Sequence, residues 1–419
     1  MNERVARIEP LLLVPSAPDA GYVELSPASR SVPLAPAFVL GPFPAPITRF
    51  YFGETEALSV GCYNLADAGV TSHGLLVRDG RLVLCDQLNL NPGSIAEARL
   101  YGAVREGAGY TSFIDGPVVS LAGPGHLIYG HWLVDFLPKL YVLHATGFDP
   151  HTARYLIPAN TPGFAFEWLH LLGIRNNQLI RFDPYRETVG ASRLIVPTLL
   201  RTNSRAHGIF RNAALYIVSL ATQRGGMLPP APGRERIFVS RRSANRDGRA
   251  LLNRDTIERM AEEAGFALVE PETLPILEQI ALFAGAGQII GEYGSALHGS
   301  MFAPPGAMVC ALRASAFHPG FLQSGVCQAM RQSIGYLFGD AAPNAVEQKF
   351  SIDANDFRWC LRLLQLYRDP EIARNDAFAI LRSPPDTSRI QSDGSRRKLR
   401  MSWRVASLLP SLFKGRRRQ

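Results

Sequence analysis

Short apolar runs alternate with segments of helical periodicity between residues 236 and 312, and this alternation restricts the fold more than any other feature of the chain. Parallel strands need long crossover connections, usually helices, so the order predicts right-handed βαβ units on a parallel sheet. The fold class is therefore α/β. The predicted strands are 236–240, 266–270, 288–291 and 307–312, and the predicted helices are 255–264, 275–285 and 295–302. Asp255 and Glu258 have capping-box spacing at the first helix.

Residues 51–222 predict a second α/β domain. Strand-like runs separated by turn residues occupy residues 55–125, and residues 131–143 predict a helix with a wide apolar face that Pro138 interrupts. Further strand-like runs flank a helical segment at 164–172. The βαβ units described above belong to a Rossmann-like domain, residues 234–382. The Gly- and Pro-rich segment 223–233 predicts a linker between the two domains. Two domains suit a chain of 419 residues, because one hydrophobic core stops growing at about 250 to 300 residues.

The two ends of the chain have biased compositions. Residues 1–50 are rich in Pro, Ala and Ser, which favours extended or irregular chain. Residues 383–419 form a tail in which basic clusters alternate with apolar residues from 396 to 419, and this predicts an amphipathic helix on an anionic membrane surface, or alternatively a disordered basic tail. Residues 396–419 hold nine basic and no acidic residues, so the net charge of +8 comes from the tail, and the nearly neutral body does not suggest nucleic-acid binding.

Cysteine usage and hydropathy indicate the compartment. The five cysteines are widely spaced, without a C-x-x-C pair or a zinc-ligand cluster, which indicates a reducing compartment and no structural metal. No apolar stretch approaches the ~20 residues of a membrane span, and the apolar run at 11–15 is shorter than a secretory core of ~7 to 15 residues. We expect a cytoplasmic protein, peripheral at the inner face of the membrane if the tail binds lipid.

Two loops of the Rossmann-like domain predict a pyrophosphate site. One leaves the first strand and carries arginines, and the other is a glycine turn between the third strand and a helix. In such sheets ligands bind beyond the C-terminal strand ends, where helix starts and arginine side chains attract anions. A solvated arginine loop and a merely structural turn are the alternatives. The candidate binding residues are Ser240, Arg241, Arg242, Glu292, Tyr293, Gly294, Ser295, Ala296, Leu297 and His298.

Five motifs in this order resemble glycosyltransferase family 61, whose bacterial members include capsular polysaccharide biosynthesis proteins. The resemblance covers residues 125–315 and rests on GHWLVDFLPKL (130–140), RIFVSRR (236–242), EQIALFAGA (278–286), IIGEYGSALH (289–298) and MFAPPG (301–306). It implies a GT-B architecture, with two Rossmann-like domains facing across a cleft. It also implies metal-independent, inverting transfer of a hexosyl or pentosyl group from a nucleotide sugar. The resemblance further implies that the donor is UDP-linked, that no further cofactor is needed, and that the acceptor is a glycan or lipid-linked intermediate of a surface polysaccharide.

This sequence departs from the family pattern at three places. Tyr293 stands where His is usual, His298 and Gly299 stand where Thr-Asn or a similar pair is usual, and Ala311 stands where an acidic residue is frequent. The first two departures change groups expected to contact the donor. The third removes a candidate for holding the ribose hydroxyls.

Inverting transfer needs a base for the acceptor hydroxyl and positive groups for the departing diphosphate. His131 and Asp135 stand at i and i+4, hence on one helical face, and the resemblance places that helix at the cleft edge. Either residue can be the base, or one can orient the other; a surface pair is the alternative. Glu292 can contact the donor or pair with an arginine. Structural roles are expected for His126, Glu278 and Gln279.

Two functions therefore remain in view. One is a cytoplasmic glycosyltransferase, which the H-W-x-x-D and S-R-R motifs favour. The other is a nucleotide-sugar-binding or assembly protein of the same fold without catalysis, which Tyr293 and Ala311 favour.

Overall fold

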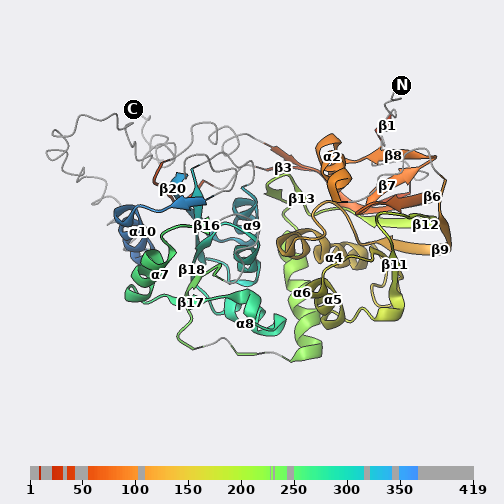
Figure 1. Cartoon of the computed structure of the whole chain (residues 1–419). Helices are drawn as coiled ribbons and strands as arrows, with labels where there is room; N and C mark the ends of the chain where they lie inside the picture. The colour runs from red at the N-terminus through yellow and green to blue at the C-terminus, as the bar shows by residue number, and fades with distance from the viewer. Residues whose placement is uncertain are drawn as a thin grey trace, which may run out of the picture.

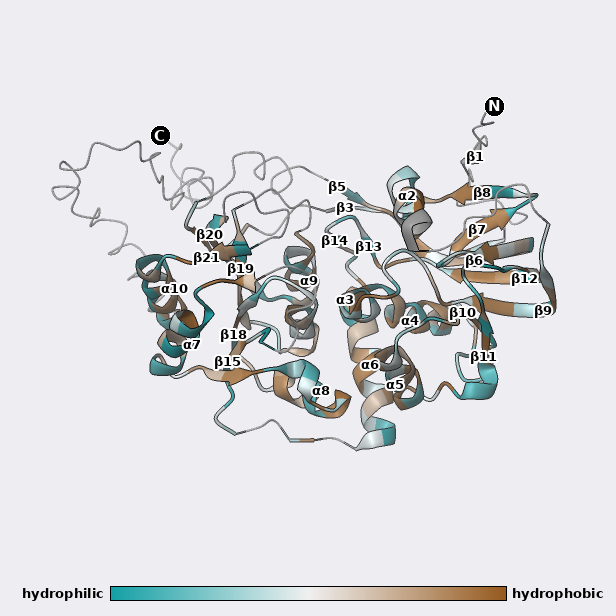
Figure 2. Cartoon of the chain, in the orientation of Figure 1, coloured by the Kyte–Doolittle hydropathy of each residue, from teal (hydrophilic) through white to brown (hydrophobic). Residues whose placement is uncertain are grey.

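Two sheets, each covered by helices, form the two lobes of the chain (Figure 1). The computed structural model describes residues 9–10, 21–31, 35–42, 55–101, 109–226, 228–229, 232–242, 250–315, 321–341 and 349–366. The first lobe is the part of 55–226 around one sheet, and the second lobe is the part of 232–366 around the other. Strands of both sheets are largely apolar in Figure 2, whereas outer helices such as α7 and α10 carry hydrophilic residues.

The first lobe contains a mixed sheet of nine strands in the order β1-β8-β7-β6-β12-β9-β10-β11, with β2 paired to β6. Strands β12, β9, β10 and β11 run parallel, while β6 is antiparallel to β12. The strand-like runs of the sequence are confirmed. The strands are β1 (Glu9–Pro10), β2 (Tyr22–Ser26), β6 (Val60–Thr71), β7 (Leu75–Arg78), β8 (Arg81–Leu84), β9 (Ser112–Ser120), β10 (Tyr155–Pro158), β11 (Leu179–Phe182) and β12 (Thr188–Pro197).

The helix predicted at 131–143 is broken into three pieces. Its middle is a π-helical turn in which the Leu137 N–H donates to the Trp132 carbonyl at 3.0 Å, directly before Pro138. Proline lacks an N–H and suits the first turn of a helix, so the next helix starts there. The pieces and the other helices of the lobe are α3 (Tyr129–His131), η3 (Trp132–Phe136), α4 (Pro138–Ala145), α2 (Pro92–Tyr101), α5 (Gly163–Leu171), α6 (Phe210–Gly225), η2 (Asp86–Leu88) and η4 (Asn176–Gln178).

The second lobe confirms the predicted parallel α/β sheet. Its order is β16-β21-β20-β19-β18-β15-β17, and β17, β15, β18, β19 and β20 are parallel. The strands are β15 (Arg236–Val239), β16 (Ala250–Leu251), β17 (Ala267–Val269), β18 (Gln288–Glu292), β19 (Met308–Ala314), β20 (Ser333–Ala341) and β21 (Lys349–Ser351). The helices are α7 (Arg254–Glu263), η5 (Pro271–Thr273), α8 (Ile276–Ala284), η6 (Ser295–Phe302), α9 (Leu322–Met330) and α10 (Ala354–Leu366).

Part of the Pro-rich N-terminal segment is regular strand, so its description as irregular is wrong for those residues. β2 joins the first sheet, and β4 (Phe38–Leu40) pairs with β20 of the second. Gly335 makes room for β4, because a Cβ there would lie 2.4 Å from the Phe38 ring. Short pairs complete the structure: β3 (Ser29–Ser31) with β5 (Thr55–Ala57), and β13 (Arg201–Thr202) with β14 (Arg205–Ala206).

The two lobes share a hydrophobic core. Ile217 and Phe210 of α6 belong to one buried cluster with Ile280, Met301 and Val326 of the second lobe. The Trp168 and Phe302 rings also stack across the boundary, with centroids 5.9 Å apart. Helix α6 ends at Gly225, inside the segment expected as a linker. Of the helices that the structure describes, none combines the length and apolarity that a membrane crossing requires.

Candidate active site

His131 and Asp135 form a hydrogen-bonded pair on the π-helical turn. The His131 Nδ1 lies 2.6 Å from Asp135 Oδ2. Arg201, which the sequence analysis did not single out, completes the group: its Nε donates to Asp135 Oδ1 at 2.6 Å and its Nη2 to Oδ2 at 2.8 Å. The Asp135 side chain is only 2% exposed, whereas that of His131 is 30% exposed. The carboxylate is therefore buried behind the imidazole.

The buried carboxylate is ionised. Burial alone would raise the pKa of Asp135, but the Arg201 charge and the hydrogen bonds from His131 and Arg201 outweigh burial and lower it. An ionised Asp135 accepts a proton-bearing Nδ1, so the His131 tautomer has its lone pair on Nε2. Lys139, one turn further, is also buried and donates to the Ala122 carbonyl at 3.2 Å. Burial lowers the pKa of Lys139 to about 8, against the opposing effect of Asp135.

The loop before α3 supports the His131 ring. Gly125 has φ +84°, and a Cβ there would lie 2.6 to 2.8 Å from the His131 ring. His126 stacks on His73 with ring centroids 4.5 Å apart, and its carbonyl accepts from Trp132 Nε1 at 2.6 Å. Burial lowers the pKa of His126 to about 3. The structural role expected for His126 is confirmed.

The strand order of the second lobe locates a ligand site. In chain order its parallel strands run 2-1-3-4-5, so the direction of winding reverses between β15 and β18. Ligands of open α/β sheets bind beyond the C-terminal ends of the strands at such a switch point. Ser240 follows β15, and Tyr293 and Gly294 follow β18. The two loops chosen from the sequence therefore lie at the switch point.

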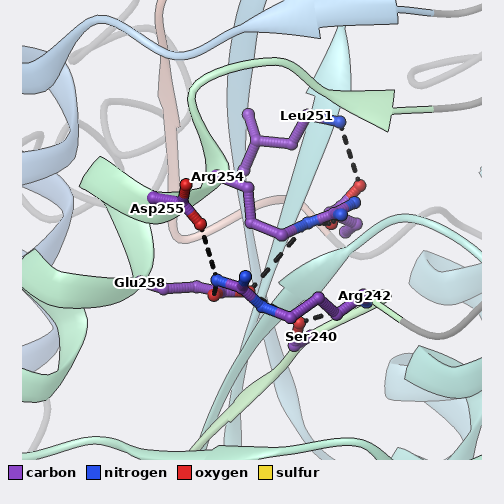
Figure 3. A network of polar contacts seen from close by, with 7 residues as sticks. Ser240, Arg242, Leu251, Arg254, Asp255 and Glu258 are labelled. Atoms are coloured by element: carbon purple, nitrogen blue, oxygen red, sulfur yellow. Dashed lines mark hydrogen bonds and ion pairs between the residues drawn. The ribbon is translucent and has the colours of Figure 1, made fainter. Parts of the chain in front are cut away.

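Arg241 and Arg242 point to different surroundings. Arg241 Nη1 lies 2.6 Å from the position that a Cβ of Gly294 would take, so its guanidinium covers the glycine turn. Arg242 Nη2 instead donates to Asp255 Oδ1 at 2.7 Å and Glu258 Oε2 at 2.5 Å (Figure 3). Of the two arginines, Arg241 is thus the one at the switch point.

Glu258 does not form the expected capping box. It is buried and accepts from Ser240 Oγ at 2.6 Å as well as from Arg242, because cationic and hydroxyl donors from the β15 loop reach it (Figure 3). Asn253 occupies the N-cap of α7 without a side-chain capping bond. The capping box was predicted from the spacing of Asp255 and Glu258 alone. That spacing does not reveal that the end of β15 lies opposite Glu258 and supplies its hydrogen-bond donors.

Glu292 forms an ion pair. Its Oε1 accepts from Arg254 Nη2 at 2.9 Å, and its Oε2 from the Leu251 N–H at 3.3 Å. Of the two roles expected for Glu292, the structure shows the arginine contact, although the partner belongs to α7 and not to the β15 loop. Leu297 packs into the core of the second lobe, with Ala296 and Tyr293 against the same cluster.

The turn at Gly294 in the second lobe contacts helix α3 of the first lobe, next to His131. A Cβ on Gly130 would lie 2.8 Å from His298 Cδ2, 2.9 Å from Ser295 Oγ and 3.0 Å from Ser295 Cα. We call this contact between α3 and η6 the junction. His131, Asp135 and Arg201 all influence the pKa of His298, which burial lowers to about 4. Residues far apart in sequence thus converge on one place.

The comparison with protein families agrees with this geometry. Residues 129–310 match the family model described as Glycosyltransferase 61. The chain carries a glycosyltransferase family 61 domain. No curated protein matches the chain. The family 61 domain begins at α3 and ends in β19, so it spans both lobes and contains both sides of the junction. The match supports a glycosyl transfer role for the protein, and with it a sugar donor and an acceptor in general.

Other residues, both inside the family 61 domain and just after it, contact the elements of the junction. Tyr129 donates from its hydroxyl to Gln279 Oε1 at 2.7 Å, and Gln279 Nε2 donates to the Leu274 carbonyl, which confirms a structural role for Gln279. The Arg313 guanidinium lies 4.2 Å from the Tyr293 ring centroid, and the Tyr293 hydroxyl accepts from the Leu322 N–H at 3.1 Å. Among the described residues, no three His, Cys, Asp or Glu side chains form a metal-binding group.

Proposed function

We propose that the protein is an inverting glycosyltransferase of GT-B architecture that moves a sugar from a nucleotide sugar to an acceptor hydroxyl. One observation carries the proposal: the His131–Asp135–Arg201 group of the first lobe meets the glycine turn at the switch point of the second. In this proposal residues 51–222 contribute the acceptor-side domain and residues 234–382 the donor-binding domain.

His131 acts as the base. Asp135 is the less suitable candidate, because both of its oxygens already accept hydrogen bonds and its pKa is lowered. His131 presents Nε2 at a partly exposed position. The acceptor oxygen attacks the anomeric carbon as its proton moves to Nε2, and the bond from that carbon to the diphosphate oxygen breaks. Asp135 keeps Nδ1 protonated and stabilises the imidazolium that forms, while Arg201 orients Asp135.

The diphosphate leaves toward Arg241 and the N–H groups of the glycine turn. Arg241 covers Gly294, so its permanent charge faces the same turn from which η6 begins. A guanidinium and backbone N–H groups can stabilise the departing diphosphate without a metal ion. We therefore propose metal-independent transfer, with no cofactor besides the nucleotide-sugar substrate.

The nucleobase has a candidate place beside the same loop. A pocket of about 250 Å³ lies between Arg242 and the end of β17, close to the ~300 Å³ lower limit of whole-ligand sites. Its apolar wall and the guanidinium at its edge suit a flat heterocycle. The lining residues are Arg234, Ser240, Arg242, Glu258, Leu268, Val269, Glu270, Thr273 and Leu274.

The biological setting is proposed from the sequence. A UDP-linked donor, a glycan or lipid-linked acceptor in surface polysaccharide synthesis, and a cytoplasmic position follow from the resemblance and the composition. Residues 396–419, which we propose to bind an anionic membrane surface, lie outside the described residues.

A donor screen tests the proposal. UDP-, GDP-, CMP- and dTDP-sugars are incubated with the full chain, and both donor hydrolysis and transfer to oligosaccharide acceptors are measured. At least one donor should be consumed by the wild-type chain but not by His131→Ala, while His170→Ala, at an exposed position of α5, keeps full activity. Donor binding without consumption would instead support the non-catalytic binding protein.

A further inference from the structure

His298 is held by one ring nitrogen only. Its Nδ1 lies 2.9 Å from Gln323 Oε1, and the Gln323 amide nitrogen donates to Ser300 Oγ at 2.6 Å. Because that amide group uses its nitrogen for Ser300, its oxygen is the atom facing His298 and must accept. The proton of the neutral imidazole is therefore on Nδ1, and Nε2 carries a lone pair.

The second ring nitrogen is directed to the junction. Within the described part of the chain, the hydrogen bonds of His298 end at Nδ1. Its Cδ2 edge, next to Nε2, faces Gly130, which directly precedes His131. The Tyr293 ring stands edge-on to the imidazole, with centroids 6.4 Å apart. A fixed acceptor atom is thus offered from the second lobe where the two lobes meet.

We propose that His298 Nε2 accepts a hydrogen bond from a hydroxyl group of the donor's sugar, which makes His298 a specificity-determining residue. This inference rests on the proposed function. The sugar has to lie between the diphosphate at Gly294 and the base at His131, and His298 belongs to the lobe that holds the diphosphate. An acceptor hydroxyl, by contrast, has to reach His131.

The chemistry of a lone-pair acceptor defines what it selects. Nε2 can pair only with an O–H or N–H of the ligand, and a polar group left unpaired in a closed site costs binding free energy. Donors with a hydroxyl at the contacted carbon should therefore bind better than deoxy or fluoro analogues. Gly130 and His298 also form a matched pair, because a larger residue at 130 would occupy the space of the imidazole edge.

Two amide substitutions separate this role from a structural one. In His298→Asn the amide reaches the place of Nδ1, so the contact with Gln323 is kept and the acceptor at Nε2 is lost. In His298→Gln the amide reaches the place of Nε2 and restores the acceptor. Binding of UDP, UDP-glucose, UDP-galactose, UDP-xylose and UDP-N-acetylglucosamine to both variants is measured by calorimetry on the full chain, with thermal unfolding as a check of folding.

We expect His298→Asn to weaken binding of the preferred UDP-sugar by about 3- to 10-fold, the loss of one hydrogen bond, while UDP binds as to the wild type. His298→Gln should retain the wild-type affinity for that sugar within about 2-fold, a difference below the worth of one hydrogen bond. The opposite order, with Asn tolerated and Gln not, would show that only the Gln323 contact matters and would overturn the inference. Equal affinities in both variants would overturn it too.

The same experiment separates the inference from the proposed function. If the Asn and Gln variants differ as expected but the wild type transfers no sugar, the specificity role stands and the catalytic proposal fails. If the wild type binds UDP yet none of the UDP-sugars more tightly than UDP, the sugar contact at His298 is overturned while the diphosphate site stands.

Discussion

Asp135 accepts three hydrogen bonds from two side chains while almost fully buried. A carboxylate removed from water is unfavourable unless charged donors replace the lost hydration, and the planar fork of Arg201 does so with two parallel bonds. The buried ion pair fixes the position of the carboxylate, and the imidazole of His131 cannot rotate without breaking its hydrogen bond to Asp135. At this scale the site depends on one ion pair that joins β13 to the π-helical turn.

Exchanging Arg201 for lysine tests the orienting role. Lysine keeps the charge but loses the bidentate fork, so Arg201→Lys should lower turnover less than Asp135→Asn, for which we expect roughly a 100-fold loss. His131→Ala should lose at least as much. Nucleoside diphosphate binding should stay nearly unchanged in all three, since none of these residues belongs to the glycine turn. Full turnover in Asp135→Asn would remove Asp135 from the mechanism.

Buried neutral histidines should make the fold sensitive to acid. The pKa of His298 is lowered to about 4 and that of His126 to about 3, from 6.5. Between pH 6.5 and these values the unfolded chain binds more protons, so their contribution to stability is complete above about pH 6.5 and is lost as pH falls. At pH 5 each should cost about 2 kcal/mol of unfolding free energy. Urea unfolding at pH 7.5 and 5 should show this drop, and His298→Gln should reduce it; an unchanged drop would mean that His298 is not the group responsible.

The elements are held in place by contacts that no single element predicts. Helix α3 starts next to η6 because Gly130 has no side chain, and η6 starts below Arg241 because Gly294 has none. Strand β15 and helix α7 are tied by Ser240, Arg242 and Glu258 (Figure 3). Each of these contacts joins the end of one element to the start of another.

Gly130→Ala tests how tightly the two lobes approach. The new Cβ would lie 2.8 Å from His298 and 3.0 Å from the Ser295 backbone, so α3 or η6 has to move. We expect a loss of about 1 to 3 kcal/mol in unfolding free energy, together with lower transfer activity. Gly163→Ala is the matched control, because nothing lies within 4 Å of its added Cβ. Equal stability of the two variants in urea would contradict close packing at the junction.

The two neighbouring arginines should behave differently. Arg241→Ala should weaken UDP binding by about 10-fold or more, since it removes a charged hydrogen-bond donor at the glycine turn. Arg242→Ala should weaken UDP binding less than Arg241→Ala, because it removes only one edge of the proposed nucleobase pocket. It should also lower the stability of the fold, because Glu258 is buried and loses a cationic partner. Calorimetry and urea unfolding on both variants measure this. Equal UDP binding by Arg241→Ala and wild type would move the diphosphate site elsewhere.

On the scale of the whole molecule, the family 61 domain bridges two lobes that share one apolar core. Strands β2 and β4 extend this connection, because one N-terminal segment adds a strand to each sheet. A shared core of this kind resists large separation of the lobes. The two sides of the junction are consequently in contact before substrate binds, so binding does not have to bring them together.

Removal of the basic tail tests whether the protein binds a membrane surface. A polybasic segment gains about 1 kcal/mol per charge near anionic lipid, and the body of the chain is close to neutral. Truncation after Ser395 should abolish sedimentation with phosphatidylserine vesicles at low salt, while transfer to a soluble acceptor is unchanged. Phosphatidylcholine vesicles serve as the control. Full-length protein that stays in the supernatant with both vesicles would contradict membrane binding.

The sequence by itself determined the α/β class and most of the strands and helices of the two lobes. Apolar periodicity follows directly from which faces are buried, so the βαβ order and the i, i+4 pairing of His131 with Asp135 were predictable. Only the tertiary structure brought Arg201 to Asp135, Gln323 to His298, and Arg242 to Glu258 in place of the capping box. These contacts join residues 66, 25 and 16 positions apart, respectively. Local patterns carry no information on such partners, because the side chain that satisfies a buried charge is chosen by the packing of whole elements.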